Sequence, residues 1–87
     1  MPTVIVTHDV EDTAHWLSSP KREEVFGPVG VTNIRTFVNP QNRTNVGLVM
    51  DVADMDAVMA MLESDEGRAA AEYDGVVVET IAFFIEE

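Results

Sequence analysis

The sequence contains no cysteine, which excludes disulfides, thiolate nucleophiles and cysteine-ligated metal sites. Only 5 basic residues stand against 16 acidic ones, and a formal net charge of −11 would repel nucleic acids and anionic membranes. Fully apolar runs span only a few residues, which is too short to cross a bilayer. The N-terminus lacks the basic and apolar regions of a secretory signal. These absences predict a cytoplasmic protein with neither a nucleic-acid nor a membrane partner.

What is present is a regular succession of strand and helix patterns in a chain of 87 residues, a length typical of one domain covering 1–87. The predicted order is strand, helix, strand, strand, helix, strand, at Thr3–His8, Val10–Phe26, Val31–Asn39, Thr44–Val52, Met55–Tyr73 and Val76–Ile85. This order predicts an α+β, ferredoxin-like βαββαβ fold, in which four antiparallel strands carry two helices on one face.

Both predicted helices contain an internal start signal. Ser19-Pro20 divides the first helix into Val10–Ser18 and Pro20–Phe26, and Ser64 caps a continuation of the second. Asp9 or Asp12 can cap the first helix, and Asp54 the second. Helical spacing predicts the inward-facing residues, which are Val10, Ala14 and Leu17 in the first helix and Met55, Val58, Met59 and Leu62 in the second.

The first and last strands are apolar on both faces, which is typical of strands covered on both sides. In the first strand Val4, Val6 and His8 alternate with Thr3, Ile5 and Thr7, and the strand is predicted to be central. Because two helices cover only one face of such a sheet, a second copy of the chain is expected on the other. The sequence therefore predicts a homodimer.

Several families share this order of elements, and most can be tested by their motifs. The third strand lacks the aromatic and basic residues of RNA-recognition domains, and metal chaperones of this shape need paired cysteines. The acidic segment after the first strand, residues 8–12, would repel the phosphate that acylphosphatases bind. Amino-acid-sensing regulatory domains stay open, because their sequence signal is diffuse.

The sequence does resemble one protein family, and the resemblance extends over nearly the whole chain. Its motifs are Asp12–Leu17, Gly30–Phe37 into Asn39-Pro40, Val46–Val52, Asp54–Ala57 and Leu62–Ser64. In order and spacing they resemble the dimeric α+β barrel superfamily, which contains antibiotic-biosynthesis monooxygenases, and within it a branch without assigned chemistry. The resemblance implies two sheets packed face to face in a homodimer, with a pocket between helices and sheet in each subunit. The haem-degrading members rely on a histidine in the second helix; residues 55–73 contain none, so no cofactor is expected.

His8 is the foremost candidate for chemistry, because it ends a strand just before a helix, where a side chain can reach a pocket. A histidine there can act as general acid or base, or it can be a buried residue bonded to a carboxylate or carbonyl. Trp16, the single tryptophan, either packs in the core or lines a pocket for an aromatic ligand. His15 is expected in solvent. Although His8, Asp9, Asp12 and His15 are near in sequence, their spacing matches no strong ligand pattern, and no metal site is predicted.

Arg35 and Glu79 are charges inside apolar strands, where an unpaired charge is costly. Either they form salt bridges or exposed edges, or they anchor a ligand, with Arg35 as a catalytic electrostatic stabiliser and Glu79 as a binding residue. Asn33 and Tyr73 can donate hydrogen bonds to a ligand, and Tyr73 can equally cap or pack at a helix end.

Two functions from different classes follow. The first is a cofactor-independent monooxygenase or isomerase/cyclase acting on an apolar or aromatic compound, with His8 as general acid/base. The second is a non-catalytic dimeric binding or structural domain. A cavity that holds His8 beside a second polar group favours the enzyme, whereas a filled core with His8 bonded to the backbone favours the alternative.

Overall fold

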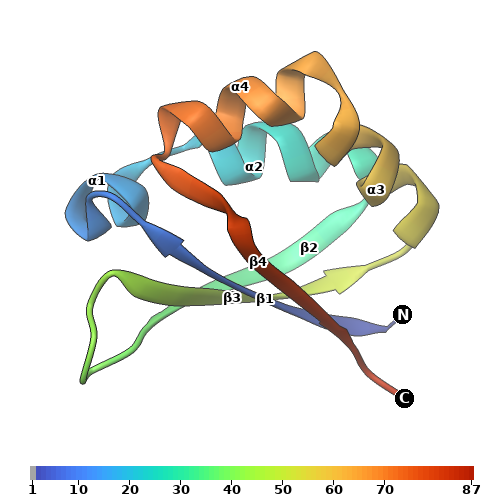
Figure 1. Cartoon of the computed structure of the whole chain (residues 1–87). Coiled ribbons are helices and arrows are strands. Elements are labelled where there is room, and N and C mark those ends of the chain that lie inside the picture. The colour runs from blue at the N-terminus through green and yellow to red at the C-terminus, as the bar shows by residue number, and fades with distance from the viewer. Residues whose placement is uncertain (1) are drawn as a thin grey trace.

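The computed structural model describes residues 2–87, which form one antiparallel sheet with helices on one side (Figure 1). The elements are β1 (Thr3–Val10), α1 (Thr13–Ser18), α2 (Lys21–Phe26), a 3-10 turn η1 (Gly27–Val29), β2 (Val31–Val38), β3 (Asn45–Val52), α3 (Met55–Glu63), α4 (Asp65–Tyr73) and β4 (Val76–Ile85). No helix within these residues is long and apolar enough to span a membrane.

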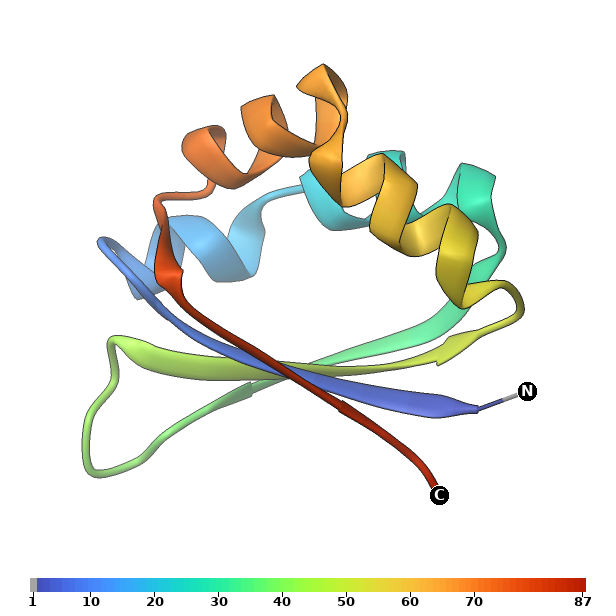
Figure 2. The same ribbon diagram turned by 45° about the vertical axis from the view of Figure 1, so that its right-hand side comes forward.

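The strand order β2-β3-β1-β4 confirms the predicted α+β, ferredoxin-like fold. β1 is central, as predicted, and pairs antiparallel with both β3 and β4. Val6, for example, is opposite Leu48 on one side and Phe83 on the other. Seen along the sheet, all the helices lie on the same side of it (Figure 2). The two layers therefore enclose a core between that face and the helices.

The core is built mainly from the alternate residues of β1 and β3 that face the helices. Val4, Met50, Val52 and Val58 are fully buried, and Val6, Val46 and Leu48 nearly so. Alternation places the strand residues of this set on one face, because successive residues of a strand point to opposite sides, and Val58 packs onto them from α3. The predicted grouping of Val4, Val6 and His8 on one face of the first strand is thereby confirmed, and this face is the one that meets the helices.

Predicted caps are found at three helix starts, and of the two candidates for the first helix Asp12 is the cap while Asp9 lies in β1. Asp12 accepts a hydrogen bond from the backbone N–H of His15 at 3.1 Å, and Asp54 caps α3 in the same way. Ser64 accepts from the N–H of Gly67 at 3.2 Å and begins α4. A Cβ on Gly67 would lie 2.9 Å from Leu62 Cα, so the tight corner between α3 and α4 requires glycine.

The predicted inner stripe of the first helix is wrong. β1 continues to Val10, whose N–H bonds the carbonyl of Thr44 at 2.8 Å, so the helix begins only at Thr13. Ala14 and Leu17 are exposed, and Trp16, which is 1% exposed, is the residue that enters the core. A helix of six residues contains fewer than two turns, too few for its apolar spacing to fix which side faces inward.

The inner stripe of the second helix is partly confirmed. Val58 is fully buried, while Met55 and Leu62 are half-buried against the core. Met59, however, is 40% exposed, and Met61 is buried in its place. Val58, Met61 and Leu62 follow the i, i+3, i+4 spacing of one helical face, and Met59 lies at the edge of that face.

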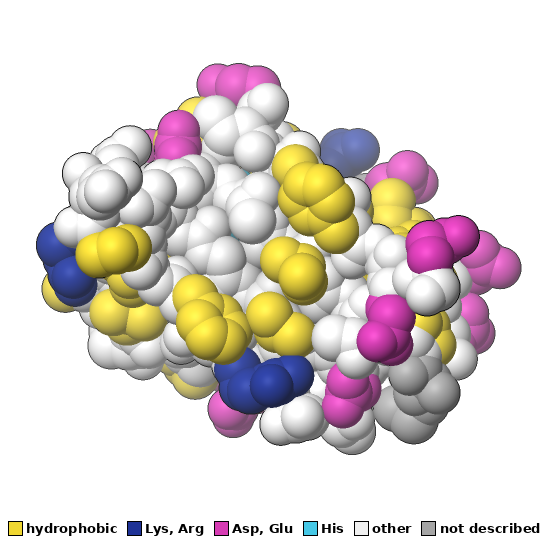
Figure 3. Space-filling view, turned by 90° about the horizontal axis from the view of Figure 1, so that it is seen from below, with side chains coloured by type: hydrophobic (Ala, Val, Ile, Leu, Met, Phe, Trp, Pro, Cys, Tyr) yellow, Lys and Arg dark blue, Asp and Glu magenta, His cyan; other side chains and the backbone are white. Residues whose placement is uncertain are grey.

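The other face of the sheet is uncovered in a single chain. Ile5, Phe37 and Phe84 are 42%, 52% and 58% exposed, although sequence alternation predicted burial of both faces of β1 and β4. Ile5 lies opposite Phe84 in the register of the two strands. Figure 3 looks onto this face and shows hydrophobic side chains gathered across its middle. We refer to it below as the open face.

Candidate functional site

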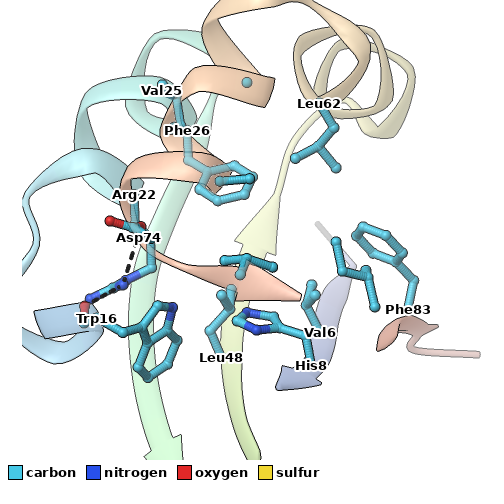
Figure 4. Close-up of a pocket in the computed structure, with 15 residues that line it drawn as sticks. Val6, His8, Trp16, Arg22, Val25, Phe26, Leu48, Leu62, Asp74 and Phe83 are labelled. Carbon is cyan, nitrogen blue, oxygen red and sulfur yellow. Dashed lines mark hydrogen bonds and ion pairs between the residues drawn. The ribbon is translucent and has the colours of Figure 1, made fainter. Parts of the chain in front are cut away.

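A cavity of about 80 Å³ lies between the helices and the inner face of the sheet. The sheet contributes Val6, His8 and Leu48, which face Phe26 and Leu62 from the helix layer (Figure 4). These walls are apolar. The charged or titratable groups among the lining residues are His8, Arg22 and Asp74, and they come from β1, α2 and the end of α4.

His8 reaches this cavity because it is on the same face of β1 as Val4 and Val6. It is 4% exposed, and its ring meets the Trp16 ring edge to face with 5.7 Å between centroids. Nδ1 lies 3.2 Å from the carbonyl oxygen of Asp9, so this nitrogen carries the proton that it donates there. In the neutral imidazole, Nε2 then holds the lone pair, which is the form of a general base.

The surroundings of His8 favour this neutral form. Burial lowers the pKa of His8 below its ordinary value of 6.5, and the nearby Arg22 cation lowers it further. The hydrogen bond to Asp9 and the carboxylates of Asp9 and Asp74 oppose that shift without reversing it. Near neutral pH, His8 is therefore uncharged and able to accept a proton.

The lowered pKa of His8 predicts a loss of stability in mild acid. The unfolded chain takes up the proton near pH 6.5, whereas the folded chain does so only at a lower pH. Stability that is present above about pH 6.5 is therefore lost as the pH falls toward the folded pKa. When the pH is lowered from 7.5 to 5.5, the urea midpoint of unfolding should fall further for the wild type than for His8→Gln. Equal decreases would show that His8 titrates alike in both states.

Arg22 and Asp74 form a buried ion pair that sequence reasoning missed. The distance from Arg22 Nη1 to Asp74 Oδ2 is 3.8 Å, and the two side chains are 10% and 6% exposed. The guanidinium also lies over the Trp16 ring, 4.4 Å from its centroid, and donates to the Trp16 carbonyl at 2.7 Å. Two features of the sequence could have drawn attention to these residues. Arg22 is one of only five basic residues, and Asp74 precedes the helix-ending Gly75.

Arg35 does not share a site with His8 in a single chain. It is opposite Val49 in the pairing of β2 with β3, and Val49 is opposite Ile5 of β1. Ile5 and His8 are on opposite faces of β1, so Arg35 lies on the open face, with the sheet between it and the cavity.

The other predicted ligand-binding residues, except Trp16, also lie away from the cavity. Asn33 has a positive φ of 55° where the pairing of β2 shifts, and its amide is 3.4 Å from Asp51 Oδ2. Glu79 is exposed in the irregular part of β4. Tyr73 is 52% exposed, and its ring packs against His15 with centroids 4.9 Å apart.

His15 is half-buried, whereas the sequence predicted exposure to solvent. Its Nε2 lies 2.8 Å from the carbonyl oxygen of Tyr73, at the end of α4. This contact ties α1 to α4 beside the Arg22–Asp74 pair. His15 therefore holds two helices together, and it does not line the cavity that contains His8.

Comparison with known proteins places this geometry in a structural group. No family model and no curated protein matches the sequence. A protein assigned as an antibiotic biosynthesis monooxygenase from Nitrosomonas europaea superposes with a TM-score of 0.67 at 15% identity, covering 100% of this chain and 97% of its own. A dimeric ferredoxin-like protein of unknown function from Jannaschia sp. CCS1 superposes with a TM-score of 0.66 at 14% identity, covering 99% and 97%. This chain shares their fold. The resemblance drawn from the sequence motifs is confirmed at that level.

Proposed function

We propose that this protein binds a small apolar or aromatic molecule between its helices and sheet, and that His8 acts on it as a general acid and base. The observation that carries the proposal is the state of His8, a buried imidazole in an apolar cavity with Nδ1 engaged by a carbonyl. A base needs such a lone pair and a water-poor site. Isomerisation of a carbonyl compound, for example, begins when a base of this kind removes a proton from the substrate.

The positive charge that such a reaction requires would come from Arg22. Proton removal leaves a developing oxyanion, which a nearby cation stabilises more strongly in a buried site than in water. Arg22 lines the cavity with His8, whereas Arg35 lies across the sheet. We therefore assign to Arg22 the role that sequence reasoning gave to Arg35. Trp16 would form the aromatic wall of the site.

The non-catalytic alternative has one observation in its favour. The cavity of about 80 Å³ is smaller than the roughly 300–1,000 Å³ typical of sites for drug-sized ligands. A larger outer groove of about 500 Å³ shares six of its lining residues, Leu62, Gly67, Ala71, Val76, Ile81 and Phe83. The cavity and the groove together have room for a ligand that extends through both. If the protein binds no ligand, the inner cavity would hold only water.

Titration with toluene tests for a ligand site. The expected result is a set of saturable NMR shifts confined to cavity residues, including the Trp16 indole N–H. Ala71 lines both hollows, so Ala71→Leu should abolish the shifts by filling their junction. Ala69→Leu is the matched control, because Ala69 is exposed on the same helix. Toluene shifts that are absent, or equal in wild type and Ala71→Leu, would support the non-catalytic domain.

We also propose that the protein is a homodimer joined through the open face. Exposed Phe37 and Phe84 project from that face, which also has a hollow of about 320 Å³ beside Gly47. Gly47 is paired with Phe37 on one side and with Thr7 on the other, and its missing side chain leaves room for a partner's aromatic ring. A similar fold from Jannaschia is described as dimeric. Because the protruding aromatic rings and the hollow lie on the same face, two identical copies of that face can fit together about a two-fold axis.

A further inference from the structure

The Arg22–Asp74 pair is placed where it can select the ligand. Asp74 is 4% exposed and lines the cavity. Its nearest cation, Arg22 Nη1, is 3.8 Å away, which is too long for a hydrogen bond. Its other oxygen, Oδ1, is buried without any hydrogen-bond partner among the described residues. A buried carboxylate with unmet hydrogen-bonding capacity is costly, and buried polar groups of this kind are rare in folded proteins.

Arg22 donates two of its five N–H groups to α1. Nη1 donates to the Trp16 carbonyl at 2.7 Å, and Nη2 lies 3.5 Å from the Leu17 carbonyl. The guanidinium face is covered by the Trp16 ring. The cation is therefore fixed against α1. At the cavity, the Asp74 carboxylate and His8 Nε2 are acceptors to which no donor among the described residues is bonded.

The charges around the outer groove also disfavour an anionic ligand. Its rim contains Glu11, Glu63 and Glu72 against a single base, Arg68. The whole chain has a net charge of −11, so the potential at the groove is negative. An anionic ligand would be repelled on approach, and inside the cavity its charge would lie near the Asp74 carboxylate.

We propose that the ligand is a neutral or cationic molecule whose hydroxyl or ammonium group donates a hydrogen bond to Asp74, while its apolar part occupies the cavity and the adjoining groove. This assignment rests on the proposed ligand site and adds the chemical class that the site accepts. Rotation about the terminal torsion of an aspartate is soft, so either carboxylate oxygen can turn to the ligand. Carboxylate ligands of the same shape would bind more weakly, because Asp74 repels them.

Four probes with one ring and different head groups test the proposal, namely toluene, benzyl alcohol, benzylamine and benzoate. NMR titration of the wild type should show benzyl alcohol or benzylamine binding about tenfold more tightly than toluene, since one hydrogen bond is gained, with benzoate weakest of the four. If benzyl alcohol binds more tightly than benzylamine, the site prefers a neutral hydrogen-bond donor. If benzylamine binds more tightly, the site prefers a cation. Asp74→Asn should reduce the advantage of benzylamine over toluene. Glu66→Gln, which removes an exposed acid of α4 away from both hollows, should leave it unchanged.

The outcomes separate this inference from the proposed function. If toluene binds as tightly as both donors, or benzoate binds best, the assignment of the ligand class is overturned while the ligand site stands. If none of the four probes binds, the ligand site itself is rejected. The ranking of the probes on the wild-type protein decides between these results even if Asp74→Asn does not fold.

Discussion

Phe84→Glu is expected to convert the protein from a dimer to a monomer. Phe84 is 58% exposed at the open face, opposite Ile5, and the proposed interface buries it. An unpaired charge placed in a buried contact costs about 3–5 kcal/mol, which raises the dissociation constant more than about 100-fold. Sedimentation equilibrium or light scattering at micromolar concentration should show one mass for the wild type and half that mass for the variant.

The control for this experiment is Leu17→Glu. Leu17 is 41% exposed and belongs to α1 on the helix side of the molecule, so the same change there should leave the dimer intact. A wild-type protein that is monomeric at these concentrations would contradict the proposed dimer. A Phe84→Glu variant that stays dimeric would place the interface on another surface.

Trp16→Ala is expected to cause the largest loss of stability among single substitutions in the site. Trp16 is 1% exposed and contacts both the His8 ring and the Arg22 guanidinium. Removing a buried aromatic side chain typically costs about 3–5 kcal/mol, against a total of about 5–15 kcal/mol for a small domain. Urea unfolding followed by far-UV circular dichroism measures the change without using tryptophan fluorescence.

Leu17→Ala is the matched comparison, because it truncates the neighbouring apolar residue of the same short helix. The expected change is below about 0.5 kcal/mol, as for other surface substitutions. Equal losses for Leu17→Ala and Trp16→Ala would mean that α1 faces the core as its apolar spacing predicted. That result would remove Trp16 from the wall of the cavity.

The predicted site was partly recoverable from the sequence. His8 and Trp16 could be singled out because a histidine at a strand end and a single tryptophan can both be recognised in the sequence. The structure brings these two together at the cavity. Arg22 and Asp74 could not be paired, because 52 positions separate them and no local pattern relates the two. Only the packing of α2 against the end of α4 makes them neighbours.

Arg35 shows a second limit of sequence reasoning. Alternation along β2 indicates which residues share a face, but it does not say which face receives the helices. The pairing of β2 with β3 decides this, and it places Arg35 with Val49 on the open face. The same pairing shifts between Thr32 and Arg35, where Asn33 adopts its positive φ, so counting residues along this strand misleads.

The sequence by itself determined the order of the elements, the caps at Asp54 and Ser64, and hence the fold. These features depend on neighbouring residues, through alternation, helical spacing and hydrogen bonds between positions three apart. The tertiary structure alone decided that Trp16 rather than Leu17 enters the core, and that Arg22 and Asp74 meet at the cavity. Both depend on how a six-residue helix and distant segments fit together in space, and burial in a shared core selects that arrangement over local preference.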